Sequence, residues 1–183
     1  MHTLIYNKLN CFDQDSSLFI LKPGESSNRG NGITIHSSKN ALVNHISRSI
    51  YNFPEDKTYI AQEYIDPLLY EGRKFDIRVW VLLANNKVWF YREGYVRTCS
   101  KEYTTKTTDK FVHLTNDAIQ KLSEDYGKYE PANKVSFQDL DKYLRKAYQY
   151  YGFYTEIYEK IKELTKILFQ VGTLFIGRTS QQF

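Results

Sequence analysis

The sequence predicts an α+β fold in which a mainly antiparallel sheet comes first and helices cover it. Up to about residue 93, apolar residues alternate or form the short runs that are typical of buried strands. From Ser136 onward they recur instead at the three- and four-residue spacing of amphipathic helices. This order, with strands first and helices last, is typical of α+β proteins.

A glycine-rich loop separates the first two predicted strands. Residues 17–22 (SLFILK) form a short apolar run, and a strand resumes at 33–35 after the segment 23–32 (PGESSNRGNG). Glycines let backbone N–H groups approach phosphate oxygens closely, and Arg29 adds a forked cation. Such a loop is more often only a turn, and Lys22 before it can be either a phosphate ligand or a solvated lysine, so the pattern leaves both interpretations open.

A helix and another strand are predicted next. Ser38 can cap a helix that Pro54 ends. The apolar residues of this helix recur at four-residue steps: Leu42, Ile46 and Ile50. Residues 58–65 (TYIAQEYI) are rich in strand-forming side chains and are predicted to be a strand buried on both faces.

Residues 73–84 (RKFDIRVWVLLA) are predicted to form one strand with two different faces. Side chains alternate along an extended chain, so Lys74, Asp76 and Arg78 share one face. The other face is apolar and holds Phe75, Ile77, Val79, Val81 and Leu83. The charged face fits either an ion-pair ladder on a solvated sheet or the lining of a cleft that holds phosphates, and spacing alone does not decide.

A hairpin and two polar segments follow. Residues 85–86 (Asn-Asn) can turn the chain into a partner strand at 88–93, and Arg92 and Arg97 supply further cations. A loop rich in Thr and Lys is predicted at 104–110. The segment 113–117 (HLTND) could donate hydrogen bonds to a nucleotide, although the local sequence favours a helix N-cap.

Two helices are predicted at the C-terminal end. Ser136 and Asp139 resemble a capping box before the first helix, which Gly152 interrupts. Its apolar stripe consists of Phe137, Leu140, Leu144, Ala147 and Tyr151. The second helix is expected from about Thr155 to a cap at Gly172. Its stripe consists of Ile157, Ile161, Leu164, Leu168 and Val171.

Composition excludes several classes of protein. A hydrophobic fraction of 42% with 25% charged residues is typical of a folded domain, and no apolar run is long enough for a membrane span. The net charge of +4 is too small to indicate a nucleic-acid binder. Two cysteines and four histidines without metal-ligand spacing do not support a disulfide scaffold or a zinc site. The aromatic fraction of 16% suggests that some rings line a binding surface.

Four blocks of the sequence, taken together, resemble a known family. They are FILKPGESSNRGNGI, AQEYIDPLLYEGRKFDIRVWVLL, YREGYVRT and HLTNDAIQKLSEDYGKYEPAN. In this order, from about Leu18 to Val171, the chain resembles the tubulin-tyrosine ligase and ligase-like family of ATP-grasp enzymes. The third block and DYGKYEPAN are closest to tubulin-tyrosine ligase itself. The loop at 23–32 is more similar to the branches that add glutamate or glycine, so the branch stays open.

The resemblance implies a central part of an ATP-grasp domain, incomplete at both ends. Residues 1–16 would be a leader, 17–116 the nucleotide-binding sheets and loop, and 117–183 a truncated helical part. Members of the family bind ATP between two sheets and form an acyl-phosphate on a carboxylate, which the amine of a free amino acid then attacks. The segment after TLFIGRTSQQF would carry a Glu-x-Asn motif that holds Mg²⁺ on the ATP phosphates, and this motif does not occur in the chain. Phosphoryl transfer by these residues alone is therefore expected to be slow.

The resemblance also assigns roles to individual residues. The nucleotide would be bound by Lys22, Arg29 and Gly30, by the hinge Gln62, Glu63, Tyr64 and Ile65, and by Lys74, Asp76, Thr115 and Asn116. The catalytic arginines would be Arg78, which holds anionic groups, and Arg97, which binds the carboxylate of the incoming amino acid. The amino-acid pocket would be bordered by Asp117 and Ala118, with Lys134 as a further substrate-binding lysine.

Two functions of different classes follow from the resemblance. The first is an ATP-dependent ligase that adds tyrosine, glutamate or glycine to tubulin, with ATP, Mg²⁺ and a free amino acid as ligands. The alternative is a catalytically silent module that binds nucleotide or tubulin. Either would act in the cytoplasm, at the cytoskeleton or cilium, without nucleic acid or membrane as a partner. A nucleic-acid module is the weakest hypothesis, because the excess charge is only +4.

Overall fold

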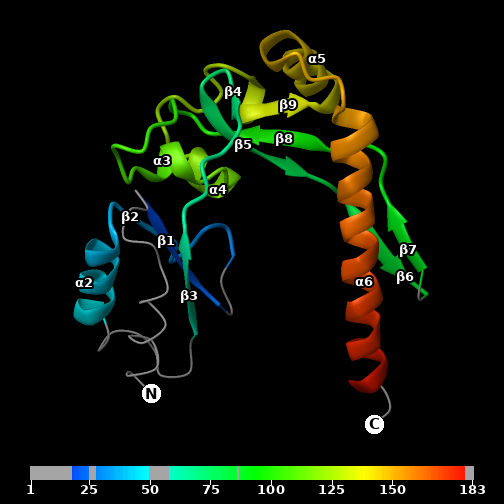
Figure 1. The fold of residues 1–183 in the computed structure, drawn as a ribbon, viewed down its shortest axis with the longest axis horizontal. Helices are drawn as coiled ribbons and strands as arrows, with labels where there is room; N and C mark the ends of the chain where they lie inside the picture. Colours follow the sequence, from blue (N-terminus) through cyan, green and yellow to red (C-terminus); the bar gives the residue numbers. More distant parts are fainter. Residues whose placement is uncertain (1–17, 25–27, 50–57, 86, 180–183) are drawn as a thin grey trace. The chain divides into compact units, whose positions relative to one another are not determined.

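The computed structural model describes residues 18–24, 28–49, 58–85 and 87–179. They combine helices with antiparallel sheets, as the sequence predicts (Figure 1). The chain divides into two compact units, which are described separately below. Unit 1 comprises Met1–Phe75 and Arg97–Asn133, and unit 2 comprises Asp76–Val96 and Lys134–Phe183.

Unit 1 contains a three-stranded sheet whose central strand is the first in sequence. Strands β1 (Phe19–Pro23), β2 (Thr34–His36) and β3 (Tyr59–Glu63) are arranged in the order β2-β1-β3, and both pairings are antiparallel. Ile20 lies opposite Ile35 on one side and Gln62 on the other. The predicted strand–loop–strand arrangement at the start of the chain is therefore confirmed.

The central strand β1 is buried on both faces because its side chains alternate between two hydrophobic clusters. Phe19 and Leu21 pack against Leu42 and Ile46 of helix α2 (Lys39–Ser49). On the other face, Leu18, Ile20 and Ile35 pack with Leu114. The predicted cap of α2 is confirmed, since the Ser38 Oγ accepts a hydrogen bond of 3.1 Å from the Ala41 N–H. The predicted positions Ile50 and Pro54 lie outside the described residues.

Two predictions about strands are wrong. Strand β3 is not buried on both faces, because it lies at the edge of its sheet and Ile60 is 55% exposed. The single strand predicted at 73–84 is broken into β5 (Arg73–Arg78) and β6 (Val81–Ala84). The break occurs because the two halves pair with different partners, and the exposed Trp80 between them stacks on the Arg78 guanidinium at 4.9 Å.

A second sheet has the strand order β4-β5-β8-β9. Its other members are β4 (Leu69–Tyr70), β8 (Tyr95–Thr98) and β9 (Lys134–Ser136). The tight hairpin between β4 and β5 turns at Glu71 and Gly72, whose φ angles of 48° and 74° suit a two-residue hairpin turn. The sequence pattern predicts no strand at β4, β8 or β9, because these strands are too short to show a period.

Short helices follow the loop predicted at 104–110 in unit 1. Helix α3 (Lys110–His113) begins where the Asp109 Oδ1 accepts a 2.9 Å hydrogen bond from the Phe111 N–H. Helix α4 (Asp117–Gln120) and the 3₁₀ turn η1 (Pro131–Asn133) follow. These turns are too short to produce an amphipathic pattern in the sequence.

Unit 2 contains a hairpin and the C-terminal helices. Strand β7 (Lys87–Phe90) pairs with β6 so that Ala84 lies opposite Lys87, and Asn85 at the turn has a φ of 49°. The hairpin is thus confirmed, although Asn86 lies outside the described residues. The capping box of α5 (Phe137–Tyr148) is also confirmed, with a 3.0 Å hydrogen bond from the Asp139 N–H to the Ser136 Oγ.

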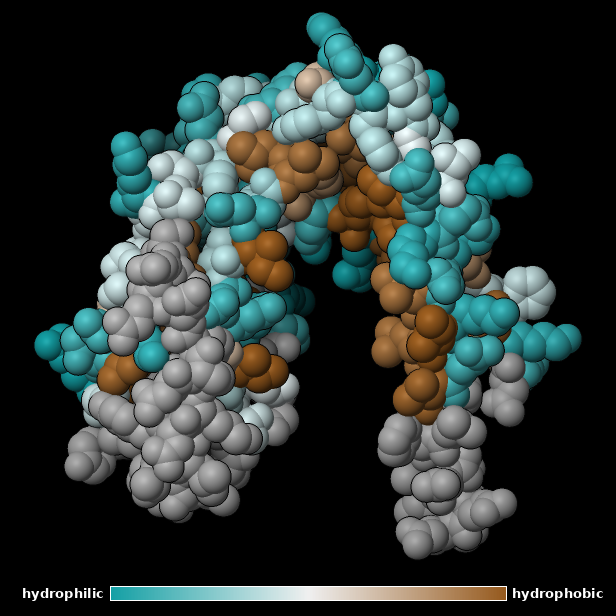
Figure 2. Space-filling view, in the orientation of Figure 1, coloured by the Kyte–Doolittle hydropathy of each residue, from teal (hydrophilic) through white to brown (hydrophobic). Residues whose placement is uncertain are grey.

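The ends of the two long helices differ from the prediction. Helix α5 ends at Tyr148, and its C-cap residue Gln149 has a φ of 52° that reverses the chain before Tyr151. A π-helical turn η2 (Phe153–Tyr158) then leads into α6 (Glu159–Thr179), which continues through Gly172. The apolar residues of α6 leave a hydrophobic surface on this helix (Figure 2). Those that are largely exposed are Leu164, Ile167, Leu168 and Val171.

No helix in the described part of the chain combines the length and the apolar character needed to cross a bilayer.

Candidate functional site

The predicted phosphate ligand Lys22 meets the predicted hinge residue Gln62. The Lys22 Nζ donates a hydrogen bond of 2.8 Å to the Gln62 Oε1. Ile20 is the residue directly opposite Gln62 in the ladder, so Lys22 is its diagonal neighbour on the same face of the sheet. The register of β1 with β3 therefore brings a cation and a predicted hinge residue together.

The glycine-rich loop packs against the start of α4. Gly30 is buried, with a φ of 82°, and a Cβ atom there would lie 2.5 Å from the Ile119 Cδ1 and 3.0 Å from the Asn116 Oδ1. Asn116 occupies the N-cap position of α4, but its side chain makes no capping hydrogen bond. The Asn116 side chain therefore contacts the loop instead of acting as the simple cap that the local sequence favours. Arg29 beside it is exposed and has a φ of 58°.

We expect Gly30→Ala to reduce the stability of the chain by about 1–2 kcal/mol, because alanine is strained at positive φ and its methyl group would meet Ile119 and Asn116. Gly72→Ala is the matched control, since Gly72 has a φ of 74° but a Cβ atom added to it would have no neighbour within 4 Å. The free energies of unfolding from urea titrations would compare the two variants. A loss at position 30 no larger than the loss at position 72 would contradict the packing of the loop on α4.

Three elements of unit 1 meet at the Tyr64 side chain. The Lys74 Nζ donates a 2.8 Å hydrogen bond to the Tyr64 Oη and lies 4.5 Å from the centre of its ring. The fully buried His113, at the end of α3, has its Nδ1 3.1 Å from the same oxygen and its Nε2 2.7 Å from the Thr107 carbonyl oxygen. Tyr64 and Lys74 are predicted nucleotide residues, and His113 joins them.

The environment of this cluster keeps both rings neutral. Burial lowers the pKa of His113, the Lys74 ammonium lowers it further, and the Thr107 carbonyl and Asp109 oppose the shift. Burial likewise raises the pKa of Tyr64, with smaller contributions from neighbouring acidic groups. Tyr103 stacks on Tyr64 with ring centres 6.3 Å apart. At neutral pH the lysine is therefore the charged member of the Lys74–Tyr64–His113 cluster.

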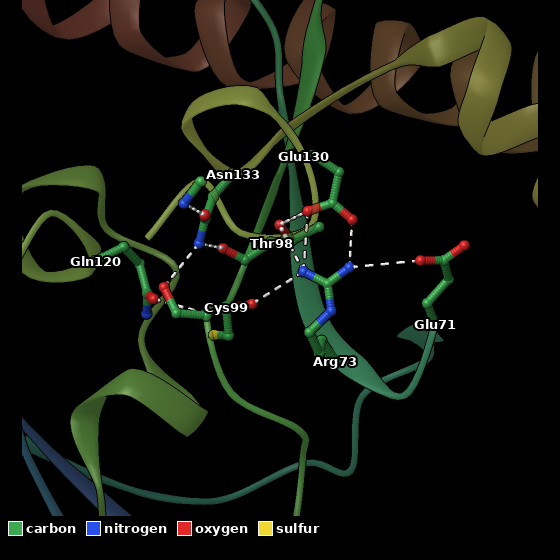
Figure 3. A network of polar contacts seen from close by, with 9 residues as sticks. Glu71, Arg73, Thr98, Cys99, Gln120, Glu130 and Asn133 are labelled. Atoms are coloured by element: carbon green, nitrogen blue, oxygen red, sulfur yellow. Dashed lines mark hydrogen bonds and ion pairs between the residues drawn. The ribbon is translucent and has the colours of Figure 1, made fainter. Parts of the chain in front are cut away.

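A buried ion pair holds β5 and β8 to the segment that follows α4. Arg73 is 1% exposed and binds the Glu130 carboxylate with both terminal nitrogens, one of them at 2.9 Å (Figure 3). The Thr98 hydroxyl donates to the same carboxylate at 2.9 Å. Burial opposes the charge on the guanidinium, but the hydrogen bonds and the charge of Glu130 outweigh it and raise the pKa of Arg73.

Two buried amides extend this network to α4. The Asn133 Nδ2 donates to the Thr98 carbonyl and to the Ser100 Oγ, at 3.1 Å and 2.9 Å (Figure 3). The Gln120 Oε1 accepts a 2.8 Å hydrogen bond from the Ser100 N–H, while its amide donates to the Leu114 carbonyl. The network therefore fixes the end of β8 against the segment that carries the predicted residues 115–118.

The predicted substrate residues are distributed along both units. Arg97 lies half-buried on β8, next to Thr98 of the network. Asp117 accepts a 2.9 Å hydrogen bond from the Tyr126 hydroxyl and pairs with Lys121, and Ala118 is exposed. Lys134 belongs to unit 2, where its Nζ lies 5.4 Å from the centre of the Tyr95 ring.

The remaining predicted nucleotide residues occupy less distinctive positions. Glu63 is half-buried opposite Phe19, Ile65 is 77% exposed, and Thr115 is buried. Lys74 belongs to unit 1, whereas Asp76 and Arg78 belong to unit 2. The cleft that their shared strand face could line therefore stays a prediction.

Among the residues that the structure describes, no three His, Cys, Asp or Glu side chains form a group able to hold a metal ion. Mg²⁺ as a cofactor stays a prediction from the resemblance.

Sequence reasoning missed the residues that support the predicted ones. They are Arg73, Glu130, Asn133, Gln120 and His113. One signal was present: by alternation Arg73 falls on the apolar face of its strand with Phe75 and Ile77. A charged residue in that position indicates a buried partner.

Comparison with known proteins identifies the family of the chain. The chain matches the tubulin-tyrosine ligase family over residues 5–179. It is 30% identical over 153 residues to tubulin glycylase 3B of Tetrahymena thermophila, a match that covers 81% of this chain and 12% of the relative. It is 36% identical over 143 residues to tubulin glycylase 3B of Drosophila melanogaster, a match that covers 73% of this chain and 18% of the relative. It is also 35% identical over 144 residues to a probable alpha-tubulin polyglutamylase of Tetrahymena thermophila (73% and 34%). The chain thus spans between about an eighth and a third of the length of these relatives.

Proposed function

The chain belongs to the tubulin-tyrosine ligase family, and we propose on this basis that it provides nucleotide-binding and amino-acid-binding residues of an ATP-dependent ligase that modifies tubulin. The fold would be of the ATP-grasp type. Because the relatives compared above are named as glycylases and a polyglutamylase, glycine or glutamate is the proposed amino acid rather than tyrosine. Tubulin as the partner implies action at the cytoskeleton.

One observation supports this proposal most directly: residues predicted to bind the nucleotide contact one another. Lys22 bonds to Gln62, Gly30 packs against Asn116, and Lys74 bonds to Tyr64. The pairs bring cations and hydrogen-bonding amides together, as binding of a nucleotide requires.

The chain's own residues have distinct tasks in this proposal. Lys22, Arg29 and Lys74 would bind phosphate oxygens, and the backbone of residues 62–65 would read the base edge. When bound, ATP supplies the phosphoryl group that activates a carboxylate. Arg97 would orient the free amino acid by its carboxylate, because a guanidinium matches the two oxygens with two parallel N–H groups.

The proposal is tested by measuring ATP binding to this protein by isothermal titration calorimetry, and by measuring its incorporation of labelled glycine or glutamate into tubulin. Binding together with incorporation would support the ligase. Binding without incorporation would favour the silent nucleotide-binding module instead. Absence of ATP binding would reject both.

We expect Arg97→Ala to weaken binding of the amino acid by about 10- to 150-fold, since it removes a charge-assisted contact of roughly 1.5–3 kcal/mol. The change should appear in the KM for the amino acid in the incorporation assay, because ATP is held by other residues. Arg97→Lys should recover only part of the affinity, as a point charge cannot form the bidentate contact. A variant that lost ATP affinity and kept its affinity for the amino acid would show that Arg97 is a phosphate ligand.

A further inference from the structure

The hydrogen bonds around Tyr64 can run in only one direction. The Thr107 carbonyl oxygen only accepts, so the His113 Nε2, 2.7 Å away, carries the hydrogen. In a neutral ring the Nδ1 is then an acceptor, and the Tyr64 hydroxyl, at 3.1 Å, donates to it. The Lys74 ammonium has no acceptor and must donate to the Tyr64 oxygen. The Thr107 carbonyl therefore determines, through His113 and Tyr64, the direction of every hydrogen bond as far as Lys74.

A charged histidine would break this order. Protonated His113 would direct a second N–H at the Tyr64 oxygen, which already accepts from Lys74, and the tyrosine hydrogen would lose its acceptor. The charged groups that influence the ring are Lys74, which opposes protonation, and Asp109, which favours it. Tyr103 covers the ring edge-on, with centres 5.8 Å apart. Because the ring is fully buried, water cannot replace the lost hydrogen bonds.

The same contacts restrain a long, flexible side chain. The Lys74 ammonium is held by the Tyr64 oxygen at 2.8 Å and lies 4.5 Å from the centre of the aromatic ring. A lysine that is already ordered loses less conformational entropy when it binds an anion. Tyr64 is also one of the proposed hinge residues through its backbone. Its side chain would therefore link the recognition of the base to that of the phosphates.

We propose that His113 is a positioning residue, which acts through the Tyr64 hydroxyl to hold the Lys74 ammonium ready for the nucleotide phosphates. This inference rests on the proposed function, since it takes Lys74 as a phosphate ligand. His113 itself touches no phosphate in this scheme. The resemblance assigns it no role; it is the first residue of the segment HLTND, two positions before the predicted ligand Thr115.

The first arm of the test needs no nucleotide. Long-range ¹H–¹⁵N correlation spectra of the wild-type chain should show His113 as the neutral Nε2–H tautomer at pH 6 and at pH 7. Tyr64→Phe removes one oxygen and keeps the ring, so the His113 Nδ1 signal should move while the fold is retained. A charged ring, or the Nδ1–H tautomer, would overturn the proposal.

The second arm measures the dissociation constant of ATP by titration. Tyr64→Phe and His113→Leu should each weaken binding by about 3- to 10-fold. His113→Asn should lose less than His113→Leu, because its amide oxygen can accept from the Tyr64 hydroxyl where the Nδ1 did. Circular dichroism would confirm that the variants are folded, and Tyr64→Phe alone carries the test if the His113 variants are not.

A third arm, in the Lys74→Met background, distinguishes a positioning role of His113 from a purely structural role. If His113 acts through Lys74, adding His113→Asn or Tyr64→Phe to Lys74→Met should not change the ATP affinity further. A further loss of similar size in that background, or single variants with wild-type affinity, would overturn the proposal. A wild-type chain that does not bind ATP would reject the proposed function and the role of Lys74 with it, while the tautomer would still show whether these hydrogen bonds exist.

Discussion

Replacing Glu130 with alanine is expected to cost about 3–5 kcal/mol of folding free energy. Arg73 is 1% exposed, and Glu130 is the carboxylate that both of its terminal nitrogens bind. Without Glu130 the guanidinium stays buried with much of its charge uncompensated, and the Thr98 hydroxyl loses its acceptor as well. The exposed carboxylate of Glu71, 3.7 Å from Arg73, is too solvated to take over this role.

Urea unfolding of Glu130→Ala and of a surface control would measure this effect. Asp125→Ala is the matched control, because it also removes a carboxylate from an ion pair, with Lys128 at 2.8 Å, but in an exposed position. That variant should lose less than about 1 kcal/mol. The double variant Arg73→Met with Glu130→Met should regain much of the stability that Glu130→Ala loses, since no buried charge remains. Equal losses of unfolding free energy for Glu130→Ala and Asp125→Ala would show that the buried pair stabilises the fold no more than an exposed ion pair does.

The ion pair also determines which way the neighbouring side chains point. Arg73 and Thr98 bond to one carboxylate, so they share a face of their sheet. Their neighbours Lys74 and Arg97 therefore lie on the opposite face, by the alternation of strands. A structural contact on one face thus orients two proposed ligand-binding cations on the other. For this reason we expect Glu130 variants that still fold to lose affinity for ligands that Glu130 does not touch.

The parts of the fold that follow from local signals could be predicted from the sequence. Ser38 and Ser136 cap helices as expected, and the apolar run of β1 is buried on both faces. The break after β5 could not be predicted, because the alternation of side chains continues through Val79 and Trp80 while the pairing partner changes. The expected cap at Gly172 was wrong because a single glycine costs a long helix only about 1 kcal/mol.

The candidate site likewise contains residues that the sequence predicts and residues that it does not predict. The ligand-binding candidates were assigned from the resemblance, and several of them contact one another in unit 1. Their supports were not predicted, because a buried network depends on residues far apart in sequence, such as Arg73 and Glu130. The sequence offers His113 only as one of four histidines without metal-ligand spacing and as the first residue of the HLTND segment. Its hydrogen bonds to Tyr64 and to the Thr107 carbonyl depend on tertiary contacts that no spacing reveals.

Unit 2 depends in a comparable way on Phe153, which the sequence analysis left outside its predicted helices. The π-helical turn begins at this residue and places its side chain fully in the interior. Its ring meets the Phe137 ring edge to face at 5.4 Å and the Tyr154 ring at 4.9 Å. The contact joins the start of α5 to the turn that leads into α6. Phe153 is therefore the aromatic residue whose loss should damage unit 2 most directly.

We expect Phe153→Ala to reduce the free energy of unfolding by about 3–5 kcal/mol, because it removes a buried ring and leaves a cavity between α5 and η2. Tyr151→Ala is the matched control, since that ring is two residues away but 64% exposed, and its loss should cost less than about 1 kcal/mol. Phe153→Leu should fall between them, as it fills part of the space. Urea titrations would give the three values, and hydrogen exchange of the α5 amides would show whether the damage reaches that helix. A Phe153→Ala variant as stable as Tyr151→Ala would mean that the π-helical turn holds unit 2 together through its backbone rather than through this ring.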